Sequence, residues 1–297
     1  MDDHQFQYVE GQARPGFPAL LAQFQADSDV AAAQAAAELD LPYGEHPRQR
    51  FDFFPALGTA QGVMMYLHAG YWQMRDKSLF RFLAPAFQAR GFHVALANYP
   101  LCPDVTLGEL VLAVQPSVAA VAEHVRQRGG ADLPLVAAGH SAGAHLASLL
   151  GFTHGALPCQ NPAKVDGVWA ISGIYDLTPL VDTTLNQKLR LDPATARRLS
   201  PQFMTEAPPV PAVWLVGGAE TPAFVAQNRQ MHHRWQGHEG GAGAWSACEE
   251  VPGADHFTVL QDWAALRGPL ADTFERWWAQ VQDQHLSAET TPQSPPR

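Results

Sequence analysis

Residues 139–143 have the pattern of a serine nucleophile held on a tight turn: they read Gly-His-Ser-Ala-Gly. The apolar run 133–138 before them is a strand candidate, and residues 144–150 after them favour a helix. A serine on a sharp strand-to-helix turn needs small neighbours, because its strained backbone leaves no room for side chains. Ser141 is therefore the candidate nucleophile, with the backbone N–H of Ala142 directed at the oxygen of the group under attack. The alternative is a glycine-flanked turn with an idle serine.

A serine nucleophile requires a general base and a carboxylate that orients the base, and both follow Ser141 in the chain. Glu220 comes just after the strand candidate 212–216, and His256 follows the strand candidate 245–251. Enzymes with a serine on this kind of turn carry their catalytic residues in the order serine, acid, histidine. We expect His256 to take the Ser141 proton, and Glu220 to fix the imidazole tautomer and stabilise the imidazolium.

Two aspartates compete with Glu220 for the acid role. Asp255 is the immediate neighbour of His256, and adjacent side chains on an extended segment point apart. Asp176 follows the preceding strand candidate, one strand earlier than the usual acid position. The sequence therefore favours Glu220 over both.

The loop after the strand candidate 62–67 is expected to supply the oxyanion hole. Residues 68–72 read His-Ala-Gly-Tyr-Trp and resemble the His-Gly-Gly-Gly loop that donates backbone N–H groups to a tetrahedral intermediate. The second position is Ala69 rather than glycine. The N–H groups of Gly70 and Tyr71, together with that of the residue after the nucleophile, are the candidate donors.

Two aromatic residues directly after this loop are candidate substrate-binding residues. Tyr71 and Trp72 could line a slot for a planar aryl ring, since small-ligand sites are usually apolar with a few placed polar groups. The proline-punctuated segment 176–209 would form a small lid above the slot. The alternative is that both rings only brace the loop.

These residues can meet only in an alternating α/β architecture. Strands are expected at 92–99 and 165–172, and helices at 78–90 and 106–128. This alternation predicts a doubly wound, mostly parallel sheet with helices on both faces. The carboxyl ends of parallel strands then share one edge, where such sheets bind their ligands.

We expect a single domain over residues 1–285. A helical segment over 16–41 is joined by a short linker to an edge strand near Phe51, and 262–285 forms the closing helix. Residues 286–297 are rich in Pro, Thr and Ser and are expected to be disordered.

The charge of the chain limits its partners. The net charge is −10, only 16% of the 297 residues are charged, and no run of Lys or Arg occurs. This composition argues against nucleic acid and anionic membranes as partners. An acidic surface gives no general attraction for an anionic substrate, so any such recognition has to be local.

The sequence indicates neither a cofactor nor a metal. His140 and His145 are five apart rather than four, and no Gly-x-Gly-x-x-Gly follows a strand. Cys102, Cys159 and Cys248 lack Cys-x-x-Cys spacing and are expected to be reduced thiols of a cytoplasmic protein. The first residues are polar rather than a signal peptide, and no apolar run reaches membrane-spanning length.

The motifs together resemble the kynurenine formamidase (arylformamidase) branch of the hormone-sensitive-lipase-like α/β-hydrolases. The runs that carry the resemblance lie at residues 43–44, 51–54, 68–73, 139–147, 172–177, 217–224 and 255–257. The resemblance extends over roughly residues 8–282, with Glu220 where many relatives carry Asp. It implies hydrolysis of N-formylkynurenine to kynurenine and formate.

Three functions therefore compete. The first is a cofactor-free serine hydrolase that acts on a small aryl formamide. The second is a carboxylesterase that uses the same triad on small esters. The third is a catalytically silent hydrolase fold that binds a ligand. The set Ser141, Glu220 and His256 favours the first two, because a receptor needs no base and acid. The oligomeric state stays open, with a homodimer as one candidate.

Overall fold

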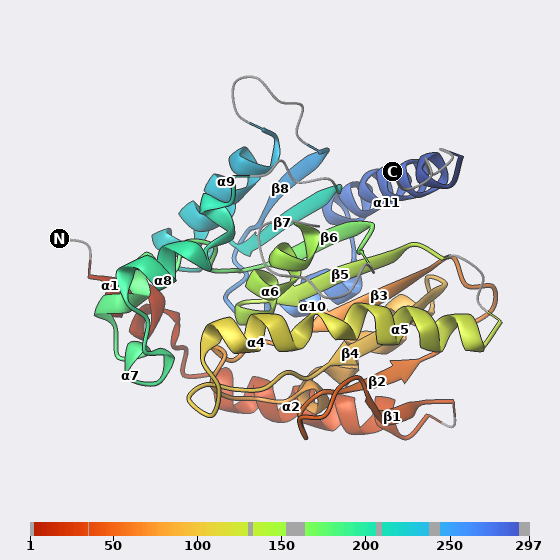
Figure 1. Cartoon of the computed structure of the whole chain (residues 1–297), viewed down its shortest axis with the longest axis horizontal. Coiled ribbons are helices and arrows are strands. Elements are labelled where there is room, and N and C mark those ends of the chain that lie inside the picture. The colour runs from red at the N-terminus through yellow and green to blue at the C-terminus, as the bar shows by residue number, and fades with distance from the viewer. Residues whose placement is uncertain are drawn as a thin grey trace, which may run out of the picture.

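The centre of the molecule is an eight-stranded sheet in the order β1-β2-β4-β3-β5-β6-β7-β8 (Figure 1). The computed structural model describes residues 3–34, 36–129, 133–152, 164–205, 210–237 and 244–290. The strands are β1 Glu38–Pro42, β2 Arg50–Phe54, β3 Gly62–Leu67, β4 Phe92–Ala97, β5 Leu135–His140, β6 Gly167–Ile171, β7 Ala212–Gly217 and β8 Ser246–Val251. The first two pairings, β1 with β2 and β2 with β4, are antiparallel, and the others are parallel. The predicted doubly wound, mostly parallel sheet is confirmed.

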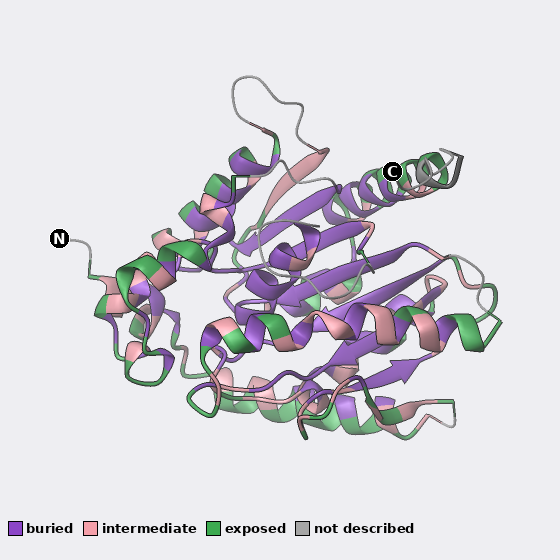
Figure 2. Cartoon of the chain, viewed as in Figure 1, coloured by how far each residue is buried: buried purple, intermediate pink, exposed green. Residues whose placement is uncertain are grey.

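Helices cover both faces of the sheet, so the central strands are buried on both sides (Figure 2). One face carries α4 Leu107–Val114, α5 Pro116–Gln127, α6 Ala142–Gly151 and α9 Pro222–Trp235. The other carries α2 Phe17–Ala32, the 3₁₀ helix η2 Lys77–Leu83, α3 Ala84–Gln88, α10 Val259–Ala265 and α11 Pro269–Thr290. Side chains alternate along each strand: Met65 and Leu67 pack against the first layer, and Met64 and Tyr66 against the second. Burial on both sides explains why these strands are near-continuous apolar runs.

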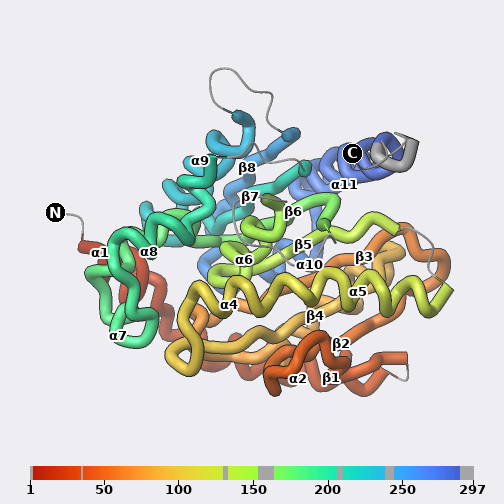
Figure 3. The backbone as a smooth tube through the Cα atoms, in the orientation of Figure 1, coloured from red at the N-terminus to blue at the C-terminus, as the bar shows by residue number. Residues whose placement is uncertain are grey.

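Two further segments lie beside each other beyond the edge where the parallel strands end (Figure 3). The N-terminal one contains α1 His4–Tyr8 and η1 Glu10–Gln12. The other contains η3 Thr178–Asp182, α7 Asn186–Leu189, α8 Pro193–Arg198 and η4 Pro201–Phe203. The Thr184 N–H donates a 2.9 Å hydrogen bond to the side-chain oxygen of Gln5, which links them directly. The expected lid segment therefore has the chain's own N-terminal segment as a neighbour.

The N-terminal helix is shorter than its alanine content suggests. The expected helical segment 16–41 ends at Ala32, and residues 38–42 form β1, which pairs with β2 at the sheet edge. Alanine favours a helix locally, but a strand beside β2 satisfies backbone groups that a longer helix would leave exposed at that edge.

Two other expected helices are interrupted at prolines. The helix expected over 106–128 divides into α4 and α5 at Pro116, and the closing helix divides into α10 and α11 at Pro269. Proline lacks the N–H of a helix interior but fits the first turn of a new helix. Helix α11 also includes residues 286–290, which the composition places in a disordered tail. Residues 291–297 lie outside the described residues.

The described thiols are unpaired, and no described helix has the length and apolar character of a membrane span. Cys102 is buried and Cys248 is half-buried, both as free thiols. Cys159 lies outside the described residues. None of the helices over the described ranges meets the requirements for crossing a bilayer.

Candidate active site

Ser141 lies on a strained turn between β5 and α6. Its backbone angles are φ 56° and ψ −116°, in a region that non-glycine residues rarely adopt. A Cβ at position 139 would lie 2.1 Å from the Gly143 carbonyl oxygen, and one at position 143 would lie 1.9 Å from that of Leu67. Both glycines are therefore required by close backbone approach, as the pattern around the serine predicts. The turn brings Ser141 next to the end of β3, where the expected oxyanion loop begins.

His256 and Glu220 contact each other in the loops that follow β8 and β7. Nδ1 of His256 lies 2.7 Å from Oε2 of Glu220, and both side chains are almost completely buried. A carboxylate only accepts hydrogen bonds, so the imidazole donates from Nδ1. In the neutral ring, Nε2 is then the basic nitrogen, as a general base for Ser141 requires.

The two competing aspartates are engaged in local turns. Oδ1 of Asp255 accepts hydrogen bonds from the backbone N–H groups of Phe257 and Thr258, at 3.0 and 2.9 Å. Oδ1 of Asp176 accepts from the backbone and the hydroxyl of Thr178. Among the described carboxylates, only Glu220 is paired with His256.

The imidazole of His256 lies among rings that carry no charge. The ring centroids of His140, Phe224 and Phe257 lie 4.7, 4.9 and 5.4 Å from that of His256. Burial, and next the charge of His256, lower the pKa of His140 well below its usual range. His140 therefore stays neutral beside the base. An imidazolium formed on His256 would depend on Glu220 for its stabilisation.

The loop after β3 presents unpaired backbone donors beside Ser141. The N–H groups of Gly70, Tyr71 and Ala142 have no hydrogen-bond acceptor among the described residues. Gly70 has φ +136°, and a Cβ there would lie 2.1 Å from the Met74 carbonyl oxygen, so the turn requires glycine. Ala69 has no positive φ, which explains why alanine fits at the second position of the loop.

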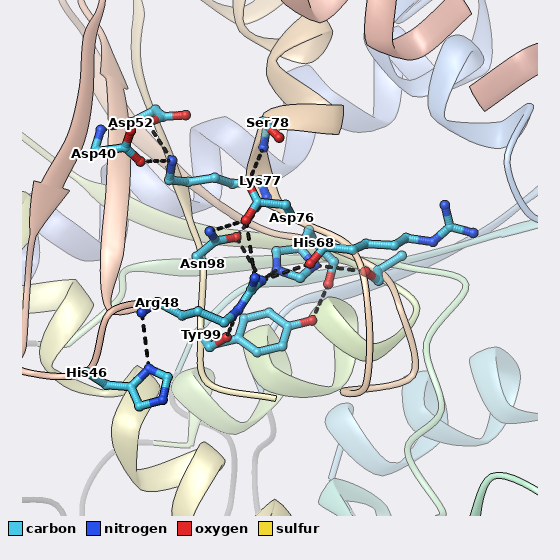
Figure 4. A network of polar contacts seen from close by, with 12 residues as sticks. Asp40, His46, Arg48, Asp52, His68, Asp76, Lys77, Ser78, Asn98 and Tyr99 are labelled. Atoms are coloured by element: carbon cyan, nitrogen blue, oxygen red, sulfur yellow. Dashed lines mark hydrogen bonds and ion pairs between the residues drawn. The ribbon is translucent and has the colours of Figure 1, made fainter. Parts of the chain in front are cut away.

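A partly buried network of polar side chains supports this loop (Figure 4). Nη2 of Arg48 donates a 2.8 Å hydrogen bond to the carbonyl oxygen of Arg75, and Nη1 lies 3.3 Å from the Asp76 carboxylate. Asp76 also accepts a 2.6 Å hydrogen bond from the side-chain amide of Asn98, a residue just past β4. The loop is therefore tied to the neighbouring strand and to the segment before β2.

His68, the first residue of the loop, is held as a neutral ring in the same network. Its Nδ1 donates a 2.8 Å hydrogen bond to the Ala69 carbonyl oxygen, and its Nε2 lies 3.4 Å from Nη2 of Arg48. The ring stacks on Tyr99 with centroids 4.3 Å apart. Burial is the main cause that lowers the pKa of His68 to about 4, and the Arg48 charge acts in the same direction. His68 is thus a structural residue of the loop.

A cavity of about 240 Å³ opens at Ser141 and His256. Gly70 and Tyr71 also line it, and the Tyr71 hydroxyl donates a 2.5 Å hydrogen bond to the carbonyl oxygen of Tyr8. Trp72 is not among the described residues that line the cavity: it is fully buried and packs edge-on against a histidine of α6. The aryl slot expected from the sequence can therefore use Tyr71, whereas Trp72 belongs to the core.

Several site residues have no signal in the sequence. The cavity wall includes Val9 and Gln12 from the N-terminal segment, Leu185 from the segment after β6, and Arg75. Ser172, just past β6, donates a hydrogen bond to the Glu220 carboxylate. Ser172 lies in the Ser-Gly-Ile-Tyr-Asp-Leu run that carries part of the family resemblance, but that run does not indicate a contact with Glu220.

Among the described residues, no cluster of three or more His, Cys, Asp or Glu side chains has the arrangement of a metal site.

A family model and curated relatives match the chain over the elements that carry this site. The model, described as BD-FAE, matches residues 53–227. A kynurenine formamidase of Salmo salar is 30% identical over 75% of this chain and 76% of its own length. The kynurenine formamidase of Danio rerio is 31% identical over 75% of each chain.

Solved structures of hydrolases share the fold. A proposed thioesterase from a Silicibacter species superposes with a TM-score of 0.77 at 32% identity, over 91% of this chain and 98% of that one. Esterase B of Lactobacillus rhamnosis, inhibited by a tributyrin phosphonate, has a TM-score of 0.69 at 17% identity, over 92% and 97%. At that identity the second similarity concerns the fold alone.

Proposed function

The chain belongs to the BD-FAE family and to the kynurenine formamidase-like branch of the α/β-hydrolases, and on this premise we propose that it hydrolyses the formamide of N-formylkynurenine. The products are kynurenine and formate. The observation that carries the proposal is the Glu220–His256 pair at 2.7 Å, with His256 and Ser141 lining one cavity.

In the first half of the proposed reaction, Ser141 attacks the formyl carbon. Nε2 of His256 takes the hydroxyl proton, and Glu220 stabilises the resulting imidazolium. The formyl oxygen becomes an oxyanion, for which the unpaired N–H groups of Gly70, Tyr71 and Ala142 are the donors. Each such donor contributes about 3 kcal/mol to stabilising the transition state.

In the second half, the imidazolium gives its proton to the aryl amine as the C–N bond breaks. Kynurenine leaves, and the formyl group stays on Ser141 as an ester. A water molecule then attacks this ester, with His256 again as the base. As the bond between the formyl carbon and Oγ breaks, the imidazolium returns this proton to Ser141 and formate is released. Atoms and protons balance without a cofactor.

The size of the cavity supports a small substrate. Its volume of about 240 Å³ is below the ~300–1,000 Å³ of sites for drug-sized ligands.

The curated relatives named kynurenine formamidase match three quarters of the chain, which favours a formamide over an ester. A cytoplasmic location is part of this proposal, supported by the free thiols Cys102 and Cys248.

Hydrolysis of small esters is the second candidate. The observation that favours it is the similarity to a proposed thioesterase at 32% identity over 91% of the chain. Both reactions use the same nucleophile, base and acid, so their residues do not distinguish them. A silent ligand-binding role does not require a serine, a base and an acid at one cavity, so the set Ser141, His256 and Glu220 disfavours it.

The test compares kcat/KM for N-formylkynurenine with that for p-nitrophenyl acetate on the same enzyme preparation. We expect the formamide to be the better substrate by at least about tenfold. A higher value for the ester would establish the second candidate instead. If a fluorophosphonate probe fails to label Ser141 and neither substrate is cleaved, the silent role would replace both.

A further inference from the structure

One fully charged side chain lines the otherwise largely apolar cavity. Among the described lining residues, Arg75 is the only Lys, Arg, Asp or Glu, and it shares the cavity with Ser141 and His256. The whole chain has a net charge of −10, so the charge of Arg75 is opposite in sign to the net charge of the protein. A local positive charge is what an acidic enzyme requires in order to bind an anionic group of its substrate.

The position of Arg75 is fixed at both ends of its side chain. Its backbone has φ +73°, and its carbonyl oxygen accepts the 2.8 Å hydrogen bond from Arg48. At the other end, the guanidinium carbon lies 4.8 Å from the ring centroid of Phe257, the residue after His256. The attraction between a cation and an aromatic face favours this position of the guanidinium next to His256.

The guanidinium of Arg75 has no hydrogen-bond or ion-pair partner within the described part of the chain. By contrast, Arg48, Arg81 and Arg126 each pair with a carboxylate. Arg75 is half-buried, and burial lowers its pKa, yet a guanidinium stays protonated throughout the pH range of proteins. A half-buried charge without a partner is costly, and a ligand carboxylate would offset that cost.

A guanidinium is also matched to a carboxylate in shape. Its N–H groups form a planar fork that can donate two parallel hydrogen bonds to the two carboxylate oxygens. N-formylkynurenine has the formamide at one end and an amino-acid carboxylate at the end of its side chain. One substrate could therefore reach Ser141 and Arg75 together, because both line the same small cavity.

We propose that Arg75 is a specificity-determining residue that binds the substrate carboxylate while Ser141 attacks the formamide. This inference rests on the proposed formamidase activity and adds the residue that recognises the carboxylate of the substrate. Arg75 binds one end of the substrate and takes no part in proton transfer.

The experiment uses a pair of substrates and three variants. N-formylkynurenine is compared with 2′-formamidoacetophenone, which keeps the ring, the ketone and the formamide but lacks the amino-acid group. We expect Arg75→Gln to lower kcat/KM about 10- to 100-fold for N-formylkynurenine, mainly through KM. The neutral formamide should change less than about threefold, because it makes no contact with the guanidinium.

Arg75→Lys and Arg197→Gln complete the design. Arg75→Lys keeps the charge without the fork and should lose less than Arg75→Gln on N-formylkynurenine. Arg197 lies 4.0 Å over the ring of Phe203 but is exposed and does not line the cavity. Arg197→Gln therefore removes a similar cation–aromatic contact and should change neither substrate. Thermal unfolding of each variant confirms that it is folded.

Equal losses of Arg75→Gln on both formamides, or no loss on either, would overturn the inference. If the wild-type protein cleaves neither formamide but does hydrolyse esters, the proposed function fails and the role of Arg75 is still decided. Phenyl hemisuccinate and phenyl butyrate then replace the formamides as the pair with and without a carboxylate. A selective loss on the hemisuccinate would uphold carboxylate binding, and equal behaviour would refute it.

Discussion

The hydroxyl of Ser172 donates a 2.5 Å hydrogen bond to Oε1 of Glu220, the carboxylate that contacts His256 through Oε2. The backbone N–H of Gly217 donates a second hydrogen bond to Oε1, at 2.9 Å. One oxygen is thus fixed by β6 and β7, and the other meets the imidazole. Ser172 is a positioning residue for Glu220, and its φ of +50° lies in a region that non-glycine residues rarely adopt.

Replacing Ser172 by alanine should lower kcat about tenfold with little change in KM, since a hydrogen bond to a charged group contributes about 1.5–3 kcal/mol. Steady-state kinetics on the formamide or an ester would measure this. Ser28→Ala is the control, because Ser28 is equally buried but bonds to Leu79 and Phe82 on the other side of the sheet. A drop in kcat for Ser28→Ala as large as that for Ser172→Ala would attribute the loss to general destabilisation.

Removing the nucleophile should abolish turnover. Ser141→Ala is expected to lower kcat on the order of 10⁶-fold, the loss typical for a serine nucleophile. Because alanine also loses the site of acylation, the variant should not react with a fluorophosphonate, which intact-protein mass spectrometry can show. More than a few per cent of wild-type activity in folded Ser141→Ala would rule out the assignment.

The acid is tested by comparing two carboxylates. Glu220→Ala should lower kcat on the order of 10⁴-fold, because His256 loses the group that sets its tautomer. Asp255→Ala should lower kcat less than about tenfold and instead reduce stability by about 0.5–2 kcal/mol, since Asp255 caps the turn at Phe257 and Thr258. The opposite ranking in kcat would transfer the acid role to Asp255.

Gly70→Ala should damage the oxyanion loop. An added Cβ would lie 2.1 Å from the Met74 carbonyl oxygen at a φ of +136°, so the loop must shift and its N–H donors move. We expect kcat to fall about 10²–10³-fold, the effect of losing one oxyanion donor. Gly108→Ala in α4 is the matched control, because its Cβ meets nothing within 4 Å. That variant should keep full activity and gain up to about 1 kcal/mol of stability.

Acid should destabilise the fold through two buried neutral histidines. Burial is the main cause that lowers the pKa of His68 and of His145 to about 4, from 6.5. The unfolded chain therefore binds these protons below pH 6.5, while the folded chain does not. Stability is retained above pH 6.5 and is lost as the pH falls toward 4.

Each histidine should contribute on the order of 2 kcal/mol to the loss between pH 7.5 and pH 5. Urea unfolding at a series of pH values would measure the slope. His145→Gln is the informative variant, since it removes the titration and can keep the hydrogen bond to the Leu199 carbonyl oxygen. An unchanged slope in this variant would show that His145 does not resist protonation in the folded state.

The site divides into residues that local patterns determine and residues that only packing brings in. The turn at Ser141 was predictable because the contacts that require its glycines are local. They lie within the five-residue turn itself and in one neighbouring strand. The loop at Gly70, and the loops that carry Glu220 and His256, were predictable as neighbours of Ser141. Each follows a parallel strand, and the carboxyl ends of parallel strands lie at one edge of the sheet. The sequence thus determined the fold class, the sheet edge and the residues expected to react there.

The tertiary structure decided which side chains face the cavity. Nothing local distinguishes Tyr71 from Trp72, yet one lines the cavity and the other is fully buried. The partners of Glu220 and the surroundings of Arg75 likewise come from segments far apart in the chain, as with Ser172, which is 48 residues from Glu220. Such contacts depend on how whole layers pack, because a side chain's direction on a loop is set by the volume that its neighbours leave free and not by its own propensity.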